Sequence, residues 1–420
     1  MNPSNMNPSY INSPCIRERI LAAGLPSPCY ILDEKKLIEN GKVLKGLQER
    51  TGCKILLAQK AFSNYDLYPA IAPYLAGTEA SGLYEARLGA EEMPGKECHV
   101  FCAAYREQDF EELLQYAGHI VFNSPSQLKK FGPLAKAAGK QIGLRINPEC
   151  STQEGHEIYD PCAPKSRLGT TISQWQEQMT PELTDLLDGI HFHTLCEQDS
   201  DALEITLQTV EEKFGFLLTR MKWLNMGGGH HITRSDYDIP RLERCIRHMQ
   251  ETYDLEIYLE PGEAVALNAG YLYTRVLDLL ENNGTKITIT DMSAACHAPD
   301  IIEMPYLPPL YGAQGISAAQ NALNPSESSV RQNPDHPSYT YRLGGPTCLA
   351  GDIVGDYCFS SPLNVGDGLV FEDMAIYSIC KNNTFNGMPL PDIFVAGADG
   401  SFELLAHFTY EDFKYRLGRK

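Results

Sequence analysis

The run KILLAQK at Lys54–Lys60 decides how this sequence can fold, because a buried apolar segment ends there in a lysine. An open, doubly wound sheet that binds a dinucleotide is expected to carry glycines directly after its first strand. Here the triplet Gly227–Gly229 follows a much later apolar run. The position of the glycines therefore favours a different α/β architecture.

Seven more short apolar runs follow the first one, separated by stretches with helical spacing such as Ser124–Ala137 and Ile239–Tyr253. Most are rich in β-branched residues and short enough for buried parallel strands. Eight such units fit a (β/α)₈ barrel, which takes roughly 250 residues. The predicted strands are Lys54–Gln59, Gly77–Ser81, His99–Ala103, His119–Asn123, Ile142–Asn147, Gly189–Thr194, Lys222–Gly228 and Glu256–Gly262.

A second domain follows the barrel in the sequence. Tyr271–Leu280, Thr285–Thr290, Gly368–Tyr377 and the stretch around Val354–Val365 alternate like strands, and Pro28–Leu32 precedes the barrel as a further one. We therefore expect an α/β plus all-β fold. The predicted parts are a barrel over residues 38–268, a β domain from 14–37 and 269–420, a disordered leader at 1–13, and a candidate mobile insertion at 314–338.

The composition excludes some classes of function. The 420 residues include 35 Lys+Arg and 54 Asp+Glu, a net charge of −19, which argues against a nucleic-acid partner and suits a cationic ligand or simple solubility. No apolar window is long enough for a membrane helix. The 13 cysteines are scattered without a CxxC pair, which predicts reduced thiols and a cytoplasmic location.

Functional residues of a barrel lie where strands end and loops begin. Five candidates stand there: Lys60, Arg145, His193, the triplet Gly227–Gly229 and Glu260. Each alone has an ordinary explanation, such as a solvated lysine or a core histidine. Together they match the needs of pyridoxal 5′-phosphate: a lysine for its aldehyde, glycines for its phosphate, a carboxylate for its ring nitrogen and a flat side chain against the ring.

A metal site is a competing interpretation of the same region. His191 and His193 share one face of a strand, and His230, His231 and Cys196 are near in sequence. No third ligand stands at a familiar spacing, so we expect no metal.

Several motifs carry a resemblance to a known family. They are LAQKAF (57–62), RINPE (145–149), APKSRLG (163–169), GIHFHTLCE (189–197), NMGGGH (225–230), EPGE (260–263), residues 291–306, GGPTCLAGDIVGD (344–356), residues 372–377 and NTFNG (383–387). In this order the chain resembles the alanine-racemase-fold, pyridoxal-phosphate-dependent basic amino acid decarboxylases, from about Pro28 to Phe394. It is most similar to the branch that acts on carboxylated polyamines.

The resemblance implies roles for individual residues. Lys60 would bond the cofactor as a Schiff base, His193 would stack on its ring, Glu260 would pair with the ring nitrogen and Arg145 would support the ring. The phosphate would be held by Gly228, Gly229 and Tyr377. Cys348 would reach across a homodimer interface into the neighbouring site, accompanied by Asp352 and Phe385, and is our candidate proton donor; Lys60 and water are its competitors.

Two departures from the family pattern bear on the substrate. Leu349 stands where decarboxylases of free diamino acids have an acidic residue, and Glu263 stands where they have an arginine. A glutamate favours a cation, so we predict that Glu263 contacts a substrate amine, with an outward salt bridge as the alternative. Asp300 is a second candidate amine contact and His297 a weaker neighbour. Several acidic contacts would suit a carboxylated triamine.

Three other functions remain open at this point. Diaminopimelate decarboxylase would need a cation for a distal carboxylate, which Glu263 does not supply. A racemase would need a second base on the opposite ring face. A non-catalytic cofactor-binding regulator would be expected to lack some of Lys60, Glu260 and Cys348, yet all three are present.

Overall fold

A computed structural model describes residues 15–153, 160–316, 338–397 and 399–418. The predicted leader lies outside these residues, and so does most of the predicted insertion; the start of the insertion forms part of β12 (Ala313–Ile316). The chain groups into two compact units. One comprises Lys35–Leu267, and the other comprises the described residues of Met1–Glu34 and Asn268–Lys420.

The first unit is a closed barrel of eight parallel strands, as predicted, and not an open doubly wound sheet. Every predicted run overlaps one strand, and only β4 and β6 begin before the predicted run, by two residues and by one. The strands are β2 (Lys54–Ala58), β3 (Gly77–Ala80), β4 (Glu97–Phe101), β5 (His119–Phe122), β6 (Gln141–Arg145), β7 (Gly189–His191), β8 (Trp223–Asn225) and β9 (Glu256–Leu259). Parallel pairing of β2 with β9 closes the ring.

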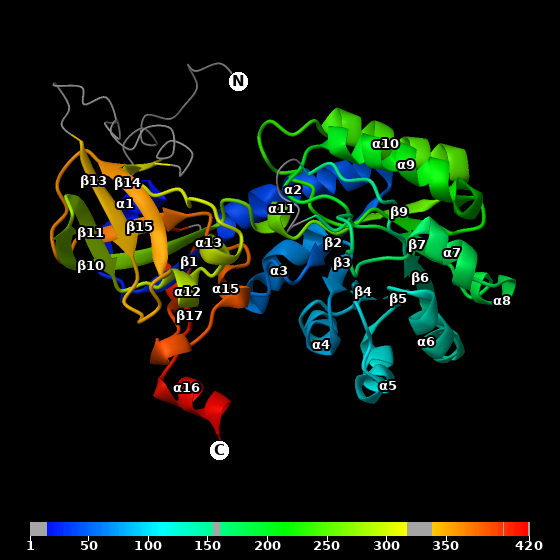
Figure 1. The fold of residues 1–420 in the computed structure, drawn as a ribbon, viewed down its shortest axis with the longest axis horizontal. Coiled ribbons are helices and arrows are strands. Elements are labelled where there is room, and N and C mark those ends of the chain that lie inside the picture. The colour runs from blue at the N-terminus through cyan, green and yellow to red at the C-terminus, as the bar shows by residue number, and fades with distance from the viewer. Residues whose placement is uncertain (1–14, 154–159, 317–337, 398, 419–420) are drawn as a thin grey trace. The chain divides into compact units, whose positions relative to one another are not determined.

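Helices surround these strands (Figure 1). They are α2 (Glu34–Thr51), α3 (Tyr68–Ile71), α4 (Leu83–Glu92), α5 (Glu107–Tyr116), α6 (Pro125–Ala137), α7 (Ile172–Gln178), α8 (Pro181–Thr184), α9 (Ser200–Leu218), α10 (Ile239–Tyr253) and α11 (Glu263–Ala266), with short 3₁₀ turns at Tyr65–Leu67 and Ala72–Tyr74. Both helices expected from spacing, α6 and α10, form. Ser124 and Asp238 cap them, each followed closely by a proline.

The barrel interior is filled by large side chains against glycines. Trp223 and Tyr258 pack with Leu56 and Val121. A Cβ on Gly189 would lie 2.0 Å from the indole of Trp223, and one on Gly143 would lie 2.4 Å from it. Gly143 on β6 and Gly189 on β7 therefore leave the volume that the Trp223 indole occupies.

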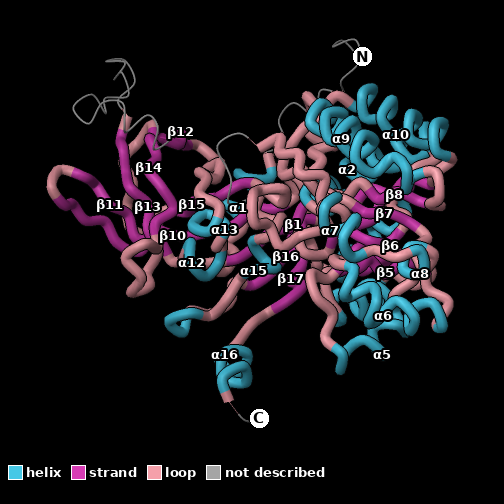
Figure 2. Tube along the Cα trace, turned by 45° about the vertical axis from the view of Figure 1, so that its right-hand side comes forward, coloured by secondary structure: helices cyan, strands magenta, loops and turns pink. Residues whose placement is uncertain are grey.

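The second unit contains a nine-stranded mixed sheet. Its order is β12–β14–β13–β11–β10–β1–β16–β17, with β15 also paired to β10; Figure 2 shows β11, β13 and β14 side by side. The strands not yet bounded are β1 (Cys29–Asp33), β10 (Gly270–Asn282), β11 (Thr285–Thr290), β13 (Tyr339–Gly344), β14 (Ile353–Phe359), β15 (Gly368–Glu372), β16 (Asp392–Ala396) and β17 (Phe402–Ala406). Strand β1, from the chain's start, pairs between β10 and β16 as a long-range member of this sheet.

Short helices complete this unit: α1 (Ile16–Ala22), α12 (Ala294–His297), α13 (Asp300–Glu303), α15 (Ser378–Lys381), α16 (Tyr410–Leu417) and a 3₁₀ turn at Phe385–Gly387. The predicted strand Gly368–Tyr377 is wrong beyond Glu372. Asp373 and Tyr377 adopt positive φ angles of 59° and 56°, which end the extended backbone. Tyr377 instead precedes α15.

All 13 cysteines are free thiols. Within the described ranges, no helix combines the length and apolar character needed to cross a membrane.

The close packing at Gly189 yields a stability prediction. Gly189→Ala should lower the free energy of unfolding by about 1–3 kcal/mol, because the added methyl overlaps the buried Trp223 ring. Gly118→Ala is the matched control, since its nearest neighbour, the Cys98 carbonyl oxygen, is 3.6 Å away. Denaturant unfolding of both variants decides; equal midpoints would contradict this account of the barrel interior.

Candidate active site

The carboxyl ends of the barrel strands bring the five predicted residues to one mouth. Lys60 follows β2, Arg145 ends β6, His193 follows β7 and Glu260 follows β9. Because all eight strands are parallel, these ends lie on one side of the barrel. The fifth element, the triplet Gly227–Gly229, follows β8 on the same side.

Glu260 is a buried carboxylate held by its neighbours. It is 5% exposed, accepts a hydrogen bond of 2.5 Å from the Asn225 amide and lies 3.0 Å from His191 Nε2. Burial alone would raise its pKa, but His191 and Asn225 outweigh burial and lower it. Glu260 is therefore ionised, as a partner for a protonated ring nitrogen must be.

The glycine triplet follows a path that side chains would block. A Cβ on Gly228 would lie 2.4 Å from the Glu260 carbonyl oxygen, and one on Gly229 would lie 2.0 Å from that of Leu195. Gly229 also has a φ of 81°. The loop after β8 thus packs closely against the segments that follow β7 and β9. Because its glycines have no side chains, its backbone N–H groups can approach a phosphate group.

His193 is fixed as a neutral ring at this loop. Its Nδ1 accepts a hydrogen bond of 2.9 Å from the Gly228 N–H. Burial, followed by the positive charges of Lys60 and Arg145, lowers its pKa well below the usual range. A neutral, oriented imidazole suits the predicted stacking role.

Arg145 is a buried cation inside the barrel. It is 5% exposed, donates to the His193 carbonyl oxygen at 3.0 Å, and its guanidinium carbon lies 4.6 Å from the ring centre of Phe101. Burial lowers its pKa to about 10, so it stays charged at neutral pH. Arg145 therefore lies beside His193, and its supporting role for a cofactor ring stays a prediction.

Glu79 in β3 is a mouth residue that sequence reasoning missed. It is 4% exposed. The preceding Thr78 faces α4, where a Cβ on Gly89 would lie 2.4 Å from its hydroxyl, so alternation points Glu79 into the barrel. Burial, with the charge of Glu260, raises its pKa well above normal although Lys60 opposes this. An acidic residue in the otherwise small or apolar run GTEAS was the available signal.

Glu263 already has a partner in the chain. His231 Nε2 lies 2.8 Å from its carboxylate, and this hydrogen bond raises the pKa of His231 although burial opposes it. With Glu197, these two residues place three candidate ligand atoms within 4.8 Å of one another. The contact of Glu263 with a substrate amine stays a prediction. In the structure its carboxylate is already bound by the imidazole of His231.

The metal interpretation of His191 and His193 meets competing interactions. His191 Nε2 is engaged by Glu260, and His193 Nδ1 by Gly228. Two side-chain groups among the described residues could hold an ion: Glu97, His99 and His119, and the set that contains Glu263. Neither includes His191 or His193.

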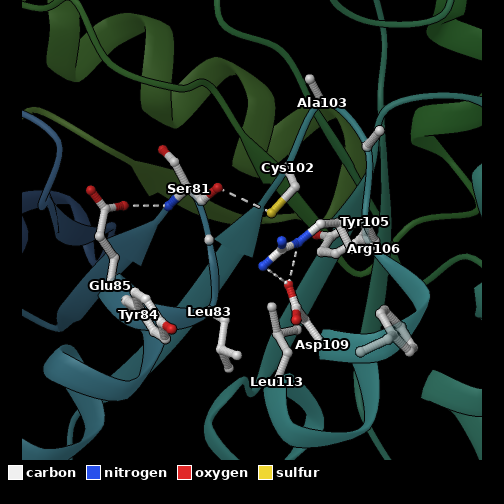
Figure 3. Close-up of a pocket in the computed structure, with 13 residues that line it drawn as sticks. Ser81, Leu83, Tyr84, Glu85, Cys102, Ala103, Tyr105, Arg106, Asp109 and Leu113 are labelled. Carbon is white, nitrogen blue, oxygen red and sulfur yellow. Dashed lines mark hydrogen bonds and ion pairs between the residues drawn. The ribbon is translucent and has the colours of Figure 1, made fainter. Parts of the chain in front are cut away.

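A pocket of about 510 Å³ opens beside the ends of β3 and β4 (Figure 3). The Glu85 carboxylate accepts a hydrogen bond of 2.6 Å from the Ser81 N–H, and the Cys102 thiol lies 3.1 Å from the Ser81 carbonyl oxygen. Arg106 and Asp109, at the start of α5, also line the pocket and form an ion pair with each other. Its lining residues Ser81 and Cys102 directly follow β3 and β4, so the pocket lies at the carboxyl end of the barrel, as does Lys60 after β2.

The remaining predicted residues belong to the second unit. Cys348 and Phe385 are exposed, whereas Asp352 is 2% exposed and fully engaged within the chain. The Asp300 carboxylate pairs with the Lys381 ammonium, which also contacts Glu303 at 2.7 Å and lies 5.8 Å from the ring centre of Tyr377. An internal cation therefore occupies the carboxylate that we predicted for a substrate amine.

His297 is a buried structural residue. Its Nδ1 accepts the Ser293 N–H at 3.1 Å, its Nε2 lies 3.0 Å from the Pro389 carbonyl oxygen, and its exposed fraction is 0%. Both ring nitrogens are thus used inside the chain. A direct contact of His297 with substrate finds no support in this arrangement.

The fold is a closed eight-stranded parallel barrel with a second sheet unit, and the residues predicted for an aldehyde cofactor lie at the carboxyl ends of the barrel strands. Residues 29–375 match the family model described as the pyridoxal-dependent decarboxylase, C-terminal sheet domain. A carboxynorspermidine/carboxyspermidine decarboxylase of Campylobacter jejuni is 38% identical over 93% of this chain and 98% of its own length. A carboxyaminopropylagmatine decarboxylase of Synechocystis is 39% identical over 96% and 98%.

Solved structures agree with these relatives. The structure of carboxynorspermidine decarboxylase from Campylobacter jejuni, complexed with norspermidine, has a TM-score of 0.83 at 37% identity, over 93% of this chain and 100% of that one. The diaminopimelate decarboxylase of Helicobacter pylori, at 18% identity and a TM-score of 0.76 over 95% of this chain and 98% of that one, shares the fold. The chain belongs to the pyridoxal-dependent decarboxylases, carboxy-lyases, in the group of the carboxynorspermidine/carboxyspermidine enzymes.

The buried carboxyl of Glu79 makes a pH prediction. When folding raises the pKa of a carboxyl group, the free energy of unfolding falls as the pH rises above the pKa of that group in the unfolded chain, roughly 4.3 for a glutamate. Glu79→Gln removes this loss. Its melting temperature should therefore increase relative to that of the wild type as the pH is raised from about 5 toward about 8. Melting temperatures across this range test it, with the exposed Glu111→Gln as control. A constant difference between wild type and Glu79→Gln would contradict a protonated Glu79.

Proposed function

We propose that this protein decarboxylates carboxynorspermidine and carboxyspermidine with bound pyridoxal 5′-phosphate. The observation that carries the proposal is 38% identity to such an enzyme along almost both whole chains, together with the intact mouth formed by Lys60, His193, the glycine loop and Glu260. The net charge of −19 suits a polycationic substrate.

The cofactor supplies an electron-accepting ring conjugated to the carbon that loses CO₂. In the proposal Lys60 offers the amine for the cofactor's aldehyde, and Glu260 keeps the ring nitrogen protonated. Gly228, Gly229 and Tyr377 hold the phosphate, while His193 and Arg145 fix the ring's position. Ionised Glu260 and neutral His193 are the protonation states that these roles require.

Cys348 is our proposed proton donor to the decarboxylated carbon. Cys348 is an exposed residue of the second unit, near Leu349 and Phe385, which are 44% and 48% exposed. Exposed apolar residues around a thiol suit a surface that a second copy of the chain covers. We therefore propose a homodimer in which each mouth receives the partner's Cys348.

The distal part of the substrate needs cationic recognition. Glu263 and Asp300 are the proposed carboxylates, with Phe385 as an apolar neighbour. Both carboxylates carry an internal cationic or imidazole partner, His231 or Lys381, so a substrate amine would share or displace that partner. Asp352 and His297 are the further proposed neighbours of the substrate, and both also make hydrogen bonds inside the chain.

Carboxyaminopropylagmatine is a second candidate substrate, because the Synechocystis relative is equally similar to this chain. It ends in a guanidinium group where the triamines end in an ammonium. Diaminopimelate is a weaker candidate, since its decarboxylases are only 23–28% identical.

A substrate panel tests the function directly. Release of CO₂ should be fastest with carboxynorspermidine or carboxyspermidine, slower with carboxyaminopropylagmatine and weak with diaminopimelate or ornithine. Faster turnover of diaminopimelate would refute the substrate assignment.

Lys60→Ala should fold normally but lose covalent attachment of the cofactor. Borohydride reduction followed by peptide mass spectrometry should label Lys60 in the wild type and in the exposed-lysine control Lys129→Ala, and should label no residue in Lys60→Ala. A label on another lysine in the wild type would rule out this assignment.

Shared sites predict complementation between two variants that each fail to form polyamine normally. Lys60→Ala mixed with Cys348→Ala should regain activity after subunit exchange, because a mixed dimer contains one site with both native residues. The wild type should sediment as a dimer. Mixtures that stay inactive although exchange is verified would contradict the shared site.

A further inference from the structure

The loop that carries Cys348 is tied to helix α12 through Asp352. One Asp352 oxygen accepts hydrogen bonds from the Thr347 hydroxyl at 2.6 Å, the Thr347 N–H at 3.3 Å and the Ser293 hydroxyl at 2.9 Å. The other oxygen accepts the Ala295 N–H at 3.2 Å. Asp352 thus joins the residue before Cys348 to the first turn of α12.

Asn383 ties a second segment to α12. Its side-chain amide donates to the Ala295 carbonyl oxygen at 2.8 Å, and its backbone N–H donates to the Cys296 carbonyl oxygen at 2.9 Å. Asn383 also accepts the Phe385 N–H at 2.9 Å. These bonds hold the turn 385–387 against α12.

Asn386 closes the ring of interactions. Its side-chain oxygen accepts the backbone N–H of Cys348 at 2.8 Å. Asn386 has a φ of 60°, a conformation that asparagine and glycine adopt more readily than other residues. Cys348 is therefore held on both sides, through Thr347 and through its own N–H, by one short helix.

Helix α12 is itself held in place by several hydrogen bonds. Ser293 caps it by accepting the Cys296 N–H at 3.1 Å. His297 ties its last turn to the Ser293 N–H and to Pro389, and burial lowers the pKa of His297 to about 4, so the ring stays neutral. Tyr30 of β1 donates to the His297 carbonyl oxygen. The support for Cys348 thus reaches into the core of the sheet.

We propose that Asn386 and Thr347 are positioning residues that fix the Cys348 thiol for proton delivery; the idea rests on the proposed function. The thiol S–H gives its proton to the substrate carbon that has lost CO₂, and the thiolate regains a proton from water. An exposed loop would otherwise sample many conformations, and fixing its backbone beforehand removes that cost from the transfer step.

Two pairs of variants test the positioning role in the holoenzyme. Asn386→Gly removes the acceptor while tolerating the positive φ, and Asn386→Asp retains an acceptor oxygen. Thr347→Val removes the hydroxyl while keeping the shape, and Thr347→Ser restores it. Asn283→Gly, an exposed asparagine with a φ of 50° in the same unit, is the matched control.

The primary readout is the ratio of polyamine to the product protonated at a different atom, because the two proton transfers compete after each CO₂ is released. We expect Asn386→Gly and Thr347→Val to lower this ratio by about fivefold, the effect of losing one ordinary hydrogen bond. KM should be unchanged. Asn386→Asp, Thr347→Ser and Asn283→Gly should keep the wild-type ratio.

The second readout is hydrogen exchange at the Cys348 amide, which should speed up in Asn386→Gly only. A wild-type product ratio in Asn386→Gly, alongside a lowered ratio in Cys348→Ala, would overturn the positioning role while leaving Cys348 as donor. An unchanged ratio in Cys348→Ala itself would instead refute the donor, and absence of CO₂ release by the wild type would refute the function.

Discussion

The buried carboxylate of Glu260 is the constraint on which the barrel mouth depends. A carboxylate that is 5% exposed is costly to bury unless donors surround it, and Asn225 and His191 provide them. These three residues come from β8, β7 and β9, which are adjacent in the barrel. Meeting the needs of one charge therefore fixes the register at which three strands end, and with it the loops that bear His193 and the glycine triplet.

The charged groups of the mouth leave a net positive charge. Lys60 and Arg145 bring positive charge, Glu260 brings one negative charge, and burial favours the neutral forms of His193 and Glu79. A net positive charge favours a ligand that carries a phosphate. In our proposal these fixed charges hold the pyridoxal ring where it can accept electrons.

Much of the barrel could be predicted from the sequence because parallel strands are buried on both faces and read as short apolar runs. The same pattern located Lys60, Arg145, His193 and Glu260, since function in a barrel follows strand ends. The strands of the second unit were harder to predict. The strand that begins at residue 368 ends at Glu372, because the backbone at Asp373 and Tyr377 adopts positive φ angles. No local sequence pattern predicts that change.

Contacts between segments that are far apart in the chain could not be predicted from the sequence. Asn225 supports Glu260 only because β8 and β9 end in register, and Asn386 meets Cys348 across 38 positions of chain. The family resemblance implied substrate contacts for Asp352 and, less strongly, for His297. What the sequence did not show is that both side chains take part in long-range hydrogen bonds that hold α12 and its loops.

The central claim is that an ionised Glu260 keeps the cofactor's ring nitrogen protonated, and the nitrogen itself can report this. Pyridoxal 5′-phosphate labelled with ¹⁵N, bound to the wild type and to Glu260→Gln, can be compared by NMR at neutral pH. The account predicts the chemical shift of a protonated nitrogen in the wild type and of an unprotonated one in the variant. An unprotonated nitrogen in the wild type, or the same shift in both proteins, would contradict it.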